Sequence, residues 1–405
     1  PNTTNILLGV YDNGDSTVAD PTPTVRTDLF EDTDSTGEGK YDPYMLTAEA
    51  DTNPNGVITI VGKDTDCVYY GVATLQMMFT SFARQKFLPV QIEDYSNVMF
   101  RGFIEGFYGG FDYEERESQM RSIRDVKGNI YVFASKTDYY HGEGWDVLYP
   151  DDELAQIKEL AEVGKETKVE YAWSVHIGKG KVLDNITPGT SEFETVVEKL
   201  EAKFQQLYDA GVRNFHILND DYNSGTYAAQ VALLNTINSW LEEKGDCGPI
   251  VYCPAGYNVG WAGSGAELQA LSELDDDIYI YWTGSDVNSP ITQDNISWPY
   301  EKSGHYPVTW LNYPCSEHDK AGIYLGDISH YVSSADGLTG QMGIISNPVD
   351  YSEANKVAYF QLLSWGWNRD EYTAYMTELW EDCFKYLQPE VYESYLTIAR
   401  NVSNC

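Results

Sequence analysis

The chain has few basic residues for its length. Of its 405 residues, 26 are Lys or Arg and 63 are Asp or Glu, which gives a formal net charge of −37. Proteins that bind nucleic acid neutralise phosphates with Lys and Arg, and a field of this sign repels polyanions. The composition therefore excludes nucleic acid as a partner and disfavours long anionic glycans and anionic membranes. Neutral or small partners fit this charge better.

Long apolar runs and cysteine pairs of the metal-binding kind are also missing. No stretch of about 18 apolar residues occurs, which is the length that a membrane-spanning helix requires. The six cysteines are widely spaced, and none belongs to a C-x-x-C pair of the kind that binds zinc. The sequence therefore predicts no membrane span, disulfide scaffold or structural zinc site, and it leaves the pairing of the cysteines open.

What the chain does have is the composition of a globular protein, with 42% hydrophobic and 14% aromatic residues. A chain of this length can hold one barrel of about 250 residues and a further domain. The acidic composition, rich in Tyr and Asn, favours a secreted or cell-surface protein. The start PNTTNILLGV, without an initiator Met, is the start expected of a processed chain.

Residues 1–98 show the pattern of a small α/β support domain. NILLGVYD is predicted to form a strand, and the turn NPNG leads into VITIV, a β-branched run typical of a second strand. FLPVQIEDY is predicted as a further strand. Between the last two strands we expect a helix that Asp64 or Asp66 caps, with apolar residues at helical spacing at Val68, Val72, Leu75, Phe79 and Phe82.

Residues 99–368 alternate between strand and helix patterns, which predicts a (β/α)8 barrel with a parallel sheet covered by helices. Two helices are clear, at Asp151–Val163 and at Ser191–Ala210, the second with a predicted capping box of Ser191 and Glu194 and a closing Gly211. Residues 369–405 are predicted as one or two helices that follow the barrel. The eight expected strands are GFIEGF, NIYVFA, VEYAWSVH, NFHILND, IVYCP, IYIYW, YPVTWLN and QMGIIS.

Polar and aromatic residues follow the ends of these strands, which is where barrels of this kind carry their working residues. Aromatic faces stack on sugar rings, and carboxylates, amides and lysine match sugar hydroxyls, so the set as a whole indicates a carbohydrate site. Any one member alone is more often structural. The strand-end residues are Glu105, Gly106, Lys136, His176, Asp220, Asp221, Tyr257, Trp282, Thr283, Trp310, Asn312 and Asn347.

Two adjacent carboxylates, Asp220 and Asp221, end the fourth strand. One of them could simply cap the following helix or turn, and NDDYN is also rich enough in oxygen for a calcium site, although no EF-hand spacing follows. If the pair acts on a glycoside, neighbouring side chains approach from one side, whereas the usual schemes need carboxyls about 5–9.5 Å apart across the sugar. Adjacency fits substrate-assisted catalysis on a 2-acetamido sugar, in which mutual repulsion raises one of the two pKa values.

Eight segments occur in a characteristic order along the chain: RGFIEGFYGGF, SKTDYYH, WSVHIG, NDDYN, CPAGYN, YWTGSDV, TWLNYPCSE and ISNP. Together they resemble glycoside hydrolase family 84, whose members are retaining β-N-acetylglucosaminidases and include bacterial homologues of the enzyme that removes O-linked GlcNAc from proteins. The resemblance covers nearly the whole chain, including residues 1–98, and the last helices resemble the start of the family's post-barrel region.

The resemblance implies a role for each matching residue. Asp220 would orient and polarise the acetamido nitrogen as an oxazoline forms, and Asp221 would be the general acid and then the base that activates water. No metal or cofactor is implied, and the partner would be a glycan or glycoprotein with a terminal N-acetylhexosamine. Substrate contacts would come from Gly106, Lys136, Tyr257, Thr283, Trp310, Asn312, Glu317 and Asn347.

The chain departs from the family pattern around the sugar. Glu317 stands where the family usually has Asp, and Gly256 stands where CPTEY has Glu. The longer Glu317 side chain suggests a shifted hexosamine preference, with tolerance of GalNAc or of a substituted sugar. A non-catalytic glycan-binding protein on the same barrel is the competing hypothesis, and a hyaluronan-cleaving enzyme is a weaker one because of the negative charge.

Overall fold

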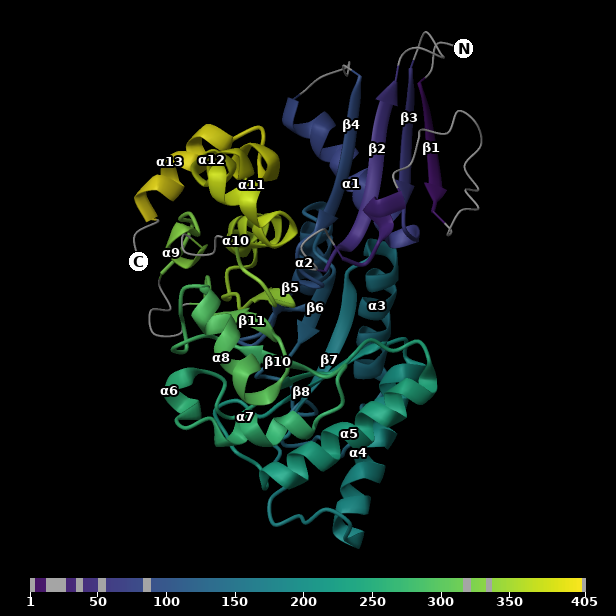
Figure 1. Cartoon of the computed structure of the whole chain (residues 1–405), viewed down its shortest axis with the longest axis vertical. Coiled ribbons are helices and arrows are strands. Elements are labelled where there is room, and N and C mark those ends of the chain that lie inside the picture. Colours follow the sequence, from purple (N-terminus) through teal and green to yellow (C-terminus); the bar gives the residue numbers. More distant parts are fainter. Residues whose placement is uncertain are drawn as a thin grey trace.

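The computed structural model describes residues 4–11, 27–33, 39–49, 56–82, 89–315, 322–332 and 337–402. Figure 1 shows a small sheet at the N-terminal end of the chain, a closed barrel, and helices that follow the barrel. Eight parallel strands alternate with helices around this barrel, which confirms the predicted (β/α)8 fold.

The N-terminal sheet has four strands in the order β1-β3-β2-β4, with helix α1 (Thr65–Phe82) against it. Asp64 caps this helix, because its Oδ1 accepts the backbone N–H groups of Asp66 and Cys67 at 2.9 Å each. A short 3-10 helix, η1, covers Thr27–Phe30. The strands are β1 (Asn5–Val10), β2 (Tyr41–Glu49), β3 (Val57–Gly62) and β4 (Val90–Ser96).

Strand β2 lies at the centre of this sheet and was not predicted. Its N-terminal part contains Pro43, and Asp42 has a φ of 55°, so the register with β4 shifts at this point. Proline and a bulge both break the alternation by which a strand is recognised. The following residues Tyr44, Met45 and Leu46 are fully buried and form the middle of the sheet's core.

The barrel closes through parallel pairing of its first and last strands, β5 and β12. Every barrel strand was predicted, because each is a nearly continuous apolar run of the kind that parallel sheets bury on both faces. The strands are β5 (Phe100–Ile104), β6 (Ile130–Phe133), β7 (Glu170–His176), β8 (Asn214–Leu218), β9 (Val251–Cys253), β10 (Tyr279–Trp282), β11 (Pro307–Leu311) and β12 (Gly343–Ser346).

Helices follow the barrel strands and cover the sheet. They are α2 (Tyr113–Asp125), α3 (Asp151–Thr167), α4 (Ser191–Asp209), α5 (Tyr227–Lys244), α6 (Val259–Ala262), α7 (Ala266–Ala270), the 3-10 helix η2 (Leu271–Glu273), α8 (Gln293–Ser303), α9 (Ser329–Val332) and α10 (Ser352–Trp367). Beyond the barrel lie α11 (Arg369–Ala374), α12 (Met376–Leu387) and α13 (Tyr392–Val402).

The predicted capping box of α4 is wrong by one residue. Thr190 is the N-cap, and its hydroxyl accepts the Phe193 N–H at 3.3 Å, so Ser191 is already the first helical residue. Serine and threonine are both favoured N-cap residues, so two of them in sequence do not show which one caps the helix. A complete capping box instead starts α2, where Asp112 and Glu115 bond each other's backbone N–H groups.

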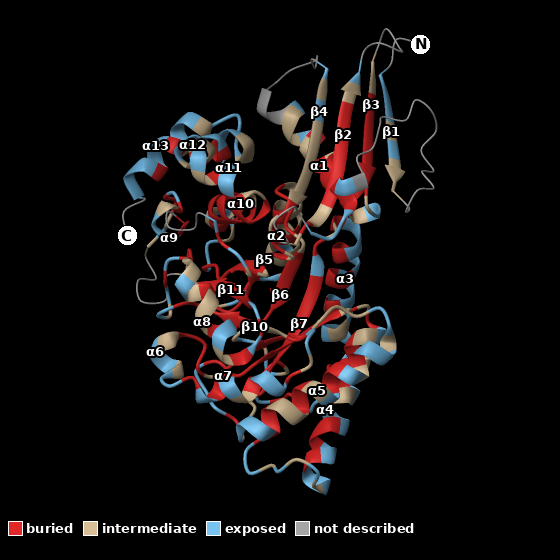
Figure 2. Ribbon diagram, viewed as in Figure 1, coloured by how far each residue is buried: buried red, intermediate tan, exposed pale blue. Residues whose placement is uncertain are grey.

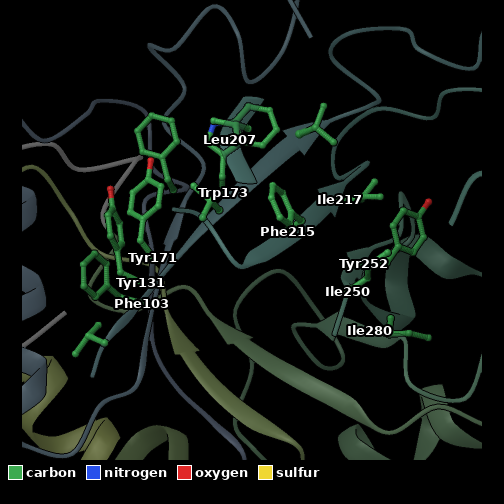
Figure 3. Close-up of a cluster of buried hydrophobic side chains, with 14 of the residues drawn as sticks. Phe103, Tyr131, Tyr171, Trp173, Leu207, Phe215, Ile217, Ile250, Tyr252 and Ile280 are labelled. Carbon is green, nitrogen blue, oxygen red and sulfur yellow. The ribbon is translucent and has the colours of Figure 1, made fainter. Parts of the chain in front are cut away.

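The main core lies between the barrel strands and their helices, and Figure 2 shows the strands buried along most of their length. Large aromatic residues fill this layer, among them Trp173 and Phe215 in Figure 3. Phe215 stacks on Phe204 of α4 with ring centroids 4.5 Å apart, which fastens that helix over β7 and β8. This packing holds the strand ends in fixed positions around the barrel axis.

Among the described residues, no helix has both the length and the apolar character that crossing a membrane would need. The cysteines within this part of the chain carry free thiols, at Cys67, Cys247, Cys253, Cys315 and Cys383.

Candidate active site

A cavity of about 180 Å³ opens where the barrel strands run into their loops. Nine of the ten residues predicted to form the site line it, and they come from the ends of strands spread around the whole barrel. The tenth, Glu317, lies outside the described residues. The lining residues are Gly106, Tyr108, Lys136, Asp220, Asp221, Cys253, Tyr257, Thr283, Val287, Asn288, Trp310, Asn312, Cys315 and Asn347.

The two aspartates both reach this cavity because the chain turns sharply between them. Successive side chains of an extended strand point in opposite directions, which would separate Asp220 from Asp221. Asp221, however, has a φ of 61°, in the left-handed region that Asp tolerates better than most residues. Such an outlier costs about 1 kcal/mol or more, and strained residues of this kind concentrate at functional sites. Asp220 is 6% exposed, whereas Asp221 lies open to solvent.

Asp220 lies between a cation and an imidazole. Lys136 Nζ is 3.5 Å from its Oδ2, and His176 Nε2 is 3.5 Å from its Oδ1. Burial opposes ionisation of this carboxyl, but Lys136 and His176 outweigh burial and hold the pKa of Asp220 below its usual value. Burial also opposes the charge on Lys136, yet the two aspartates hold the pKa of its ammonium above its usual value. Asp220 therefore does not have the raised pKa that repulsion within the pair was expected to give one of its members.

Asp221 has a different partner. The hydroxyl of Tyr257 donates a hydrogen bond to its Oδ1 at 3.0 Å. Burial and the nearby Asp221 carboxylate raise the pKa of the Tyr257 phenol, so this group remains a donor. The loop that carries Tyr257 is fastened by Glu267 of α7, whose carboxylate accepts the N–H groups of Ala255 and Gly256 at 3.0 and 2.8 Å. The pair is thus held in two unlike environments.

The opposite wall of the cavity consists of an amide network. Asn312 Oδ1 accepts hydrogen bonds from Trp310 Nε1 and Asn347 Nδ2, both at 2.9 Å, and its Nδ2 donates to the Val287 carbonyl at 2.7 Å. Three strand ends therefore fix the orientation of Asn312. The Oδ1 of Asn347 is buried without a hydrogen-bond partner among the described residues, so it can accept one from a ligand.

Gly106 and Thr283 complete the wall. A Cβ on Gly106 would lie 2.8 Å from Cζ2 of Trp310, so only glycine allows the indole to come this close. The Thr283 hydroxyl donates to the carbonyl of Asp286 at 2.7 Å. Because this hydroxyl is already engaged, the methyl group is the part of Thr283 left to meet an apolar substituent.

Sequence reasoning missed five residues of the cavity wall: Tyr108, Cys253, Val287, Asn288 and Cys315. Tyr108 and Val287 lie in segments that had been singled out, and Cys253 is the last residue of β9, so strand-end position was the usable signal. Glu105, in contrast, is a strand-end residue with a structural role. It is fully buried, Arg116 binds it through two hydrogen bonds of 2.9 and 2.8 Å, and it accepts the N–H of Phe111.

The described residues do not support the two other interpretations of the aspartates, a helix cap and a metal site. Helix α5 is capped by Thr226, whose hydroxyl accepts the N–H of Ala229 at 3.2 Å, so neither aspartate caps it. In the part of the chain that the structure describes, no group of three or more His, Cys, Asp or Glu side chains is arranged to hold a metal ion.

Comparison with known proteins decides the family. Residues 101–400 match the family model described as NAGidase, β-N-acetylglucosaminidase. The structure is similar to that of CpGH84D, with a TM-score of 0.87 and 32% identity over 98% of this chain and 64% of that one. The chain belongs to glycoside hydrolase family 84. This confirms the family that the motifs of the sequence indicated.

Other family 84 relatives are more distant. The structure of CpGH84B has a TM-score of 0.78 and 26% identity over 92% of this chain and 65% of that one. Protein O-GlcNAcase of Rattus norvegicus is 27% identical over 282 residues, and that of Mus musculus is 28% identical over 285 residues. Each of these alignments covers 65% of this chain, which spans 29% of the length of either mammalian protein.

Proposed function

We propose that this family 84 chain is a retaining β-N-acetylhexosaminidase that removes terminal β-linked GlcNAc from glycans or glycoproteins. In this proposal Asp221 donates a proton to the glycosidic oxygen while the carbonyl oxygen of the substrate's acetamido group attacks C1. The C1–O bond breaks, the aglycone leaves with the proton, and an oxazoline forms. Water then attacks C1, Asp221 accepts its proton, and the sugar is released with its original configuration.

Asp220 serves the acetamido group in this scheme. An ionised carboxylate accepts the amide N–H and stabilises the positive charge that develops as the oxazoline forms. The lowered pKa of Asp220 supports this role, since a protonated carboxyl could not do so. Tyr257 is proposed to contact the acetamido oxygen and to hold Asp221, and Thr283 and Trp310 to enclose the methyl group.

The remaining wall residues are proposed to bind hydroxyls. The ring hydroxyls would be bound by Lys136, by the carbonyl of Gly106 and by Asn347, whose Oδ1 has no partner among the described residues. Asn312 would lie near the glycosidic oxygen. Glu317 is proposed to contact O4 and O6. Its extra methylene relative to Asp is the reason to measure GalNAc as well as GlcNAc substrates.

One observation carries the proposal: two consecutive aspartates line the same wall region of one cavity instead of facing each other across it. Among the described residues that line the cavity, no carboxylate other than this pair is present to serve as nucleophile, which supports attack by the acetamido group of the substrate. The opposite wall contributes amides and an indole.

The test is hydrolysis of 4-nitrophenyl β-GlcNAc, β-GalNAc and β-glucoside, and of an alkyl β-GlcNAc with a poor leaving group, by the chain and by its Asp221→Asn variant. We expect the GlcNAc substrate to be cleaved and the glucoside, which lacks the acetamido group, to resist. Asp221→Asn should lower kcat far more on substrates with poor leaving groups than on nitrophenyl substrates, because only the former need an acid. Equal cleavage of the glucoside would contradict the mechanism. Saturable sugar binding without turnover would identify a glycan-binding protein.

A further inference from the structure

Two buried polar atoms beside the cavity face each other. Nε2 of His176 and Oδ1 of Asp220 are 3.5 Å apart, and neither atom has a hydrogen-bond partner among the described residues. His176 is 1% exposed and ends β7, and Asp220 follows the adjacent strand β8. Their meeting is thus fixed by two neighbouring barrel strands and not by a surface loop.

The other nitrogen of His176 determines where its proton lies. Nδ1 is 3.1 Å from the backbone N–H of Lys179, which can only donate, so Nδ1 accepts. A neutral imidazole whose Nδ1 accepts carries its proton on Nε2. Burial lowers the pKa of His176 below its usual value, so the ring is neutral around neutral pH and directs an N–H at Asp220.

We propose that His176 is a positioning residue for Asp220, whose neutral imidazole donates from Nε2 to Oδ1 and holds the carboxylate ionised and aimed at the acetamido N–H of the substrate. The inference rests on the proposed function, because it concerns the carboxylate that would polarise the substrate amide. It assigns a task to the His of WSVHIG, which is not among the residues that line the cavity.

Lys136 and His176 approach different oxygens of Asp220. The Lys136 ammonium lies near Oδ2 and compensates the negative charge, whereas the His176 ring lies near Oδ1 and orients the carboxylate. Because the ring is neutral, it adds no second cation next to an amide that becomes positive. The His176 ring packs against the rings of His141 and Tyr222, which lie edge-on to it at centroid distances of 5.7 and 5.4 Å. A fixed donor loses little entropy when the substrate binds.

The titratable groups around this pair come from several strand ends. Those that act on Asp220 or His176 are Lys136, His141, Glu143, Lys179, Asp221, Tyr252, Cys253 and Tyr257. Burial lowers the pKa of His141 to about 3, so it is neutral as well. Its Nδ1 is 2.8 Å from the Ser174 carbonyl and donates to it, which leaves Asp220 with Lys136 as its nearest cation.

Variants of His176 test the proposal through the pH profile of kcat/KM on 4-nitrophenyl β-GlcNAc. His176→Phe keeps a ring and removes the donor, and His176→Gln keeps an N–H donor on a flexible chain. His216→Gln is the matched control, because His216 is an equally buried barrel histidine whose Nδ1 lies 2.8 Å from Tyr281 Oη and whose pKa is lowered by burial alone.

We expect His176→Phe to lower kcat/KM about tenfold or more at neutral pH, as for loss of a hydrogen bond to a charged group. The acidic limb of the profile should move to higher pH, since Asp220 then loses a group that lowers its pKa. His176→Gln should restore much of that limb, and His216→Gln should leave it in place. An unchanged limb in a folded His176→Phe variant would overturn the proposal.

A second measurement does not depend on activity. Nitrogen-15 spectra of the six histidines, with His176 assigned by difference from His176→Gln, report which ring nitrogen carries the proton. We expect the Nε2–H form, neutral down to acidic pH. An Nδ1–H form would overturn the inference whatever the enzyme does. If the native chain leaves the GlcNAc substrate intact while the Nε2–H form is observed, the proposed function fails and the contact to Asp220 stands.

Discussion

Replacing Asp94 with Asn should destabilise the chain without altering the cavity. Asp94, on β4 of the N-terminal sheet, accepts three hydrogen bonds at Oδ2: from Tyr44 Oη at 2.7 Å, from Trp367 Nε1 at 2.8 Å and from Lys127 Nζ at 2.9 Å. Lys127 follows α2 and Trp367 ends α10, so one carboxylate ties the sheet to two barrel helices. The Lys127 ammonium also lies 4.1 Å from the centre of the Trp367 ring.

The loss of stability in Asp94→Asn can be estimated from the buried Lys127 ammonium that remains without its carboxylate. Lys127 is 7% exposed, and in Asp94→Asn its ammonium stays buried next to a neutral amide. Removing one partner of a buried ion pair costs about 3–5 kcal/mol. Because Asp94 keeps some contact with solvent, we expect the low end, a loss of about 3 kcal/mol in the free energy of unfolding.

The pH dependence supplies an internal check. Burial opposes ionisation of Asp94, but Lys127 and the hydrogen bonds outweigh it, so the pKa of Asp94 is lowered in the folded chain. A lowered carboxyl pKa contributes stability that is complete above the unfolded value of about 3.9 and is lost as the pH falls through the folded value. The difference in stability between the native chain and Asp94→Asn should therefore shrink below about pH 4.

Urea unfolding followed by circular dichroism measures these stabilities, and hydrolysis of a nitrophenyl substrate measures the site. The double variant Asp94→Asn/Lys127→Met removes both charges and should recover much of the lost stability, because no unpaired ammonium remains. Equal stability of the native chain and Asp94→Asn at pH 7, or a double variant less stable than the single one, would refute the reasoning. Activity per folded molecule should be unchanged throughout.

Two further substitutions probe the cavity itself. Tyr257→Phe removes the hydrogen bond to Asp221, and a hydrogen bond to a charged acceptor is worth about 1.5–3 kcal/mol. In steady-state assays kcat should therefore fall about ten- to hundredfold, and a change below about twofold would contradict this expectation. Gly106→Ala places a Cβ 2.8 Å from Trp310, and the displaced indole should lower kcat/KM about tenfold or more, while thermal unfolding shows whether the fold is kept.

The parts of the fold that could be predicted are those in which burial alone sets the residue pattern. The barrel strands are buried on both faces and appear as apolar runs, which is why each was found in sequence. Strand β2 was missed because Pro43 and the bulge at Asp42 interrupt its pattern, although its middle residues, Tyr44 to Leu46, are as buried as any in the chain. Tertiary pairing with β3 and β4, which no local pattern encodes, makes this segment a strand.

The residues of the site could be predicted from their position at strand ends more than from their residue type. Strand-end location brought together nine of the ten predicted residues, including Lys136 and Asn347, which are far apart in sequence. The same rule also selected Glu105, which is buried against Arg116 and serves the fold. Strand-end position therefore predicts which residues lie at the end of the barrel. Whether such a residue lines the cavity or belongs to the core depends on the direction of its side chain.

The different surroundings of the two aspartates could not be predicted from residue patterns, because they depend on a backbone angle. Sequence reasoning expected like charges to raise one pKa of the pair. The left-handed turn at Asp221 instead gives each carboxylate its own partners, with Lys136 and His176 at Asp220 and Tyr257 at Asp221. Lys136 compensates the burial of Asp220 and holds its pKa low, and in the proposed mechanism the exposed Asp221 exchanges protons with substrate and water. Two chemically identical residues thus acquire different partners from a single turn between them.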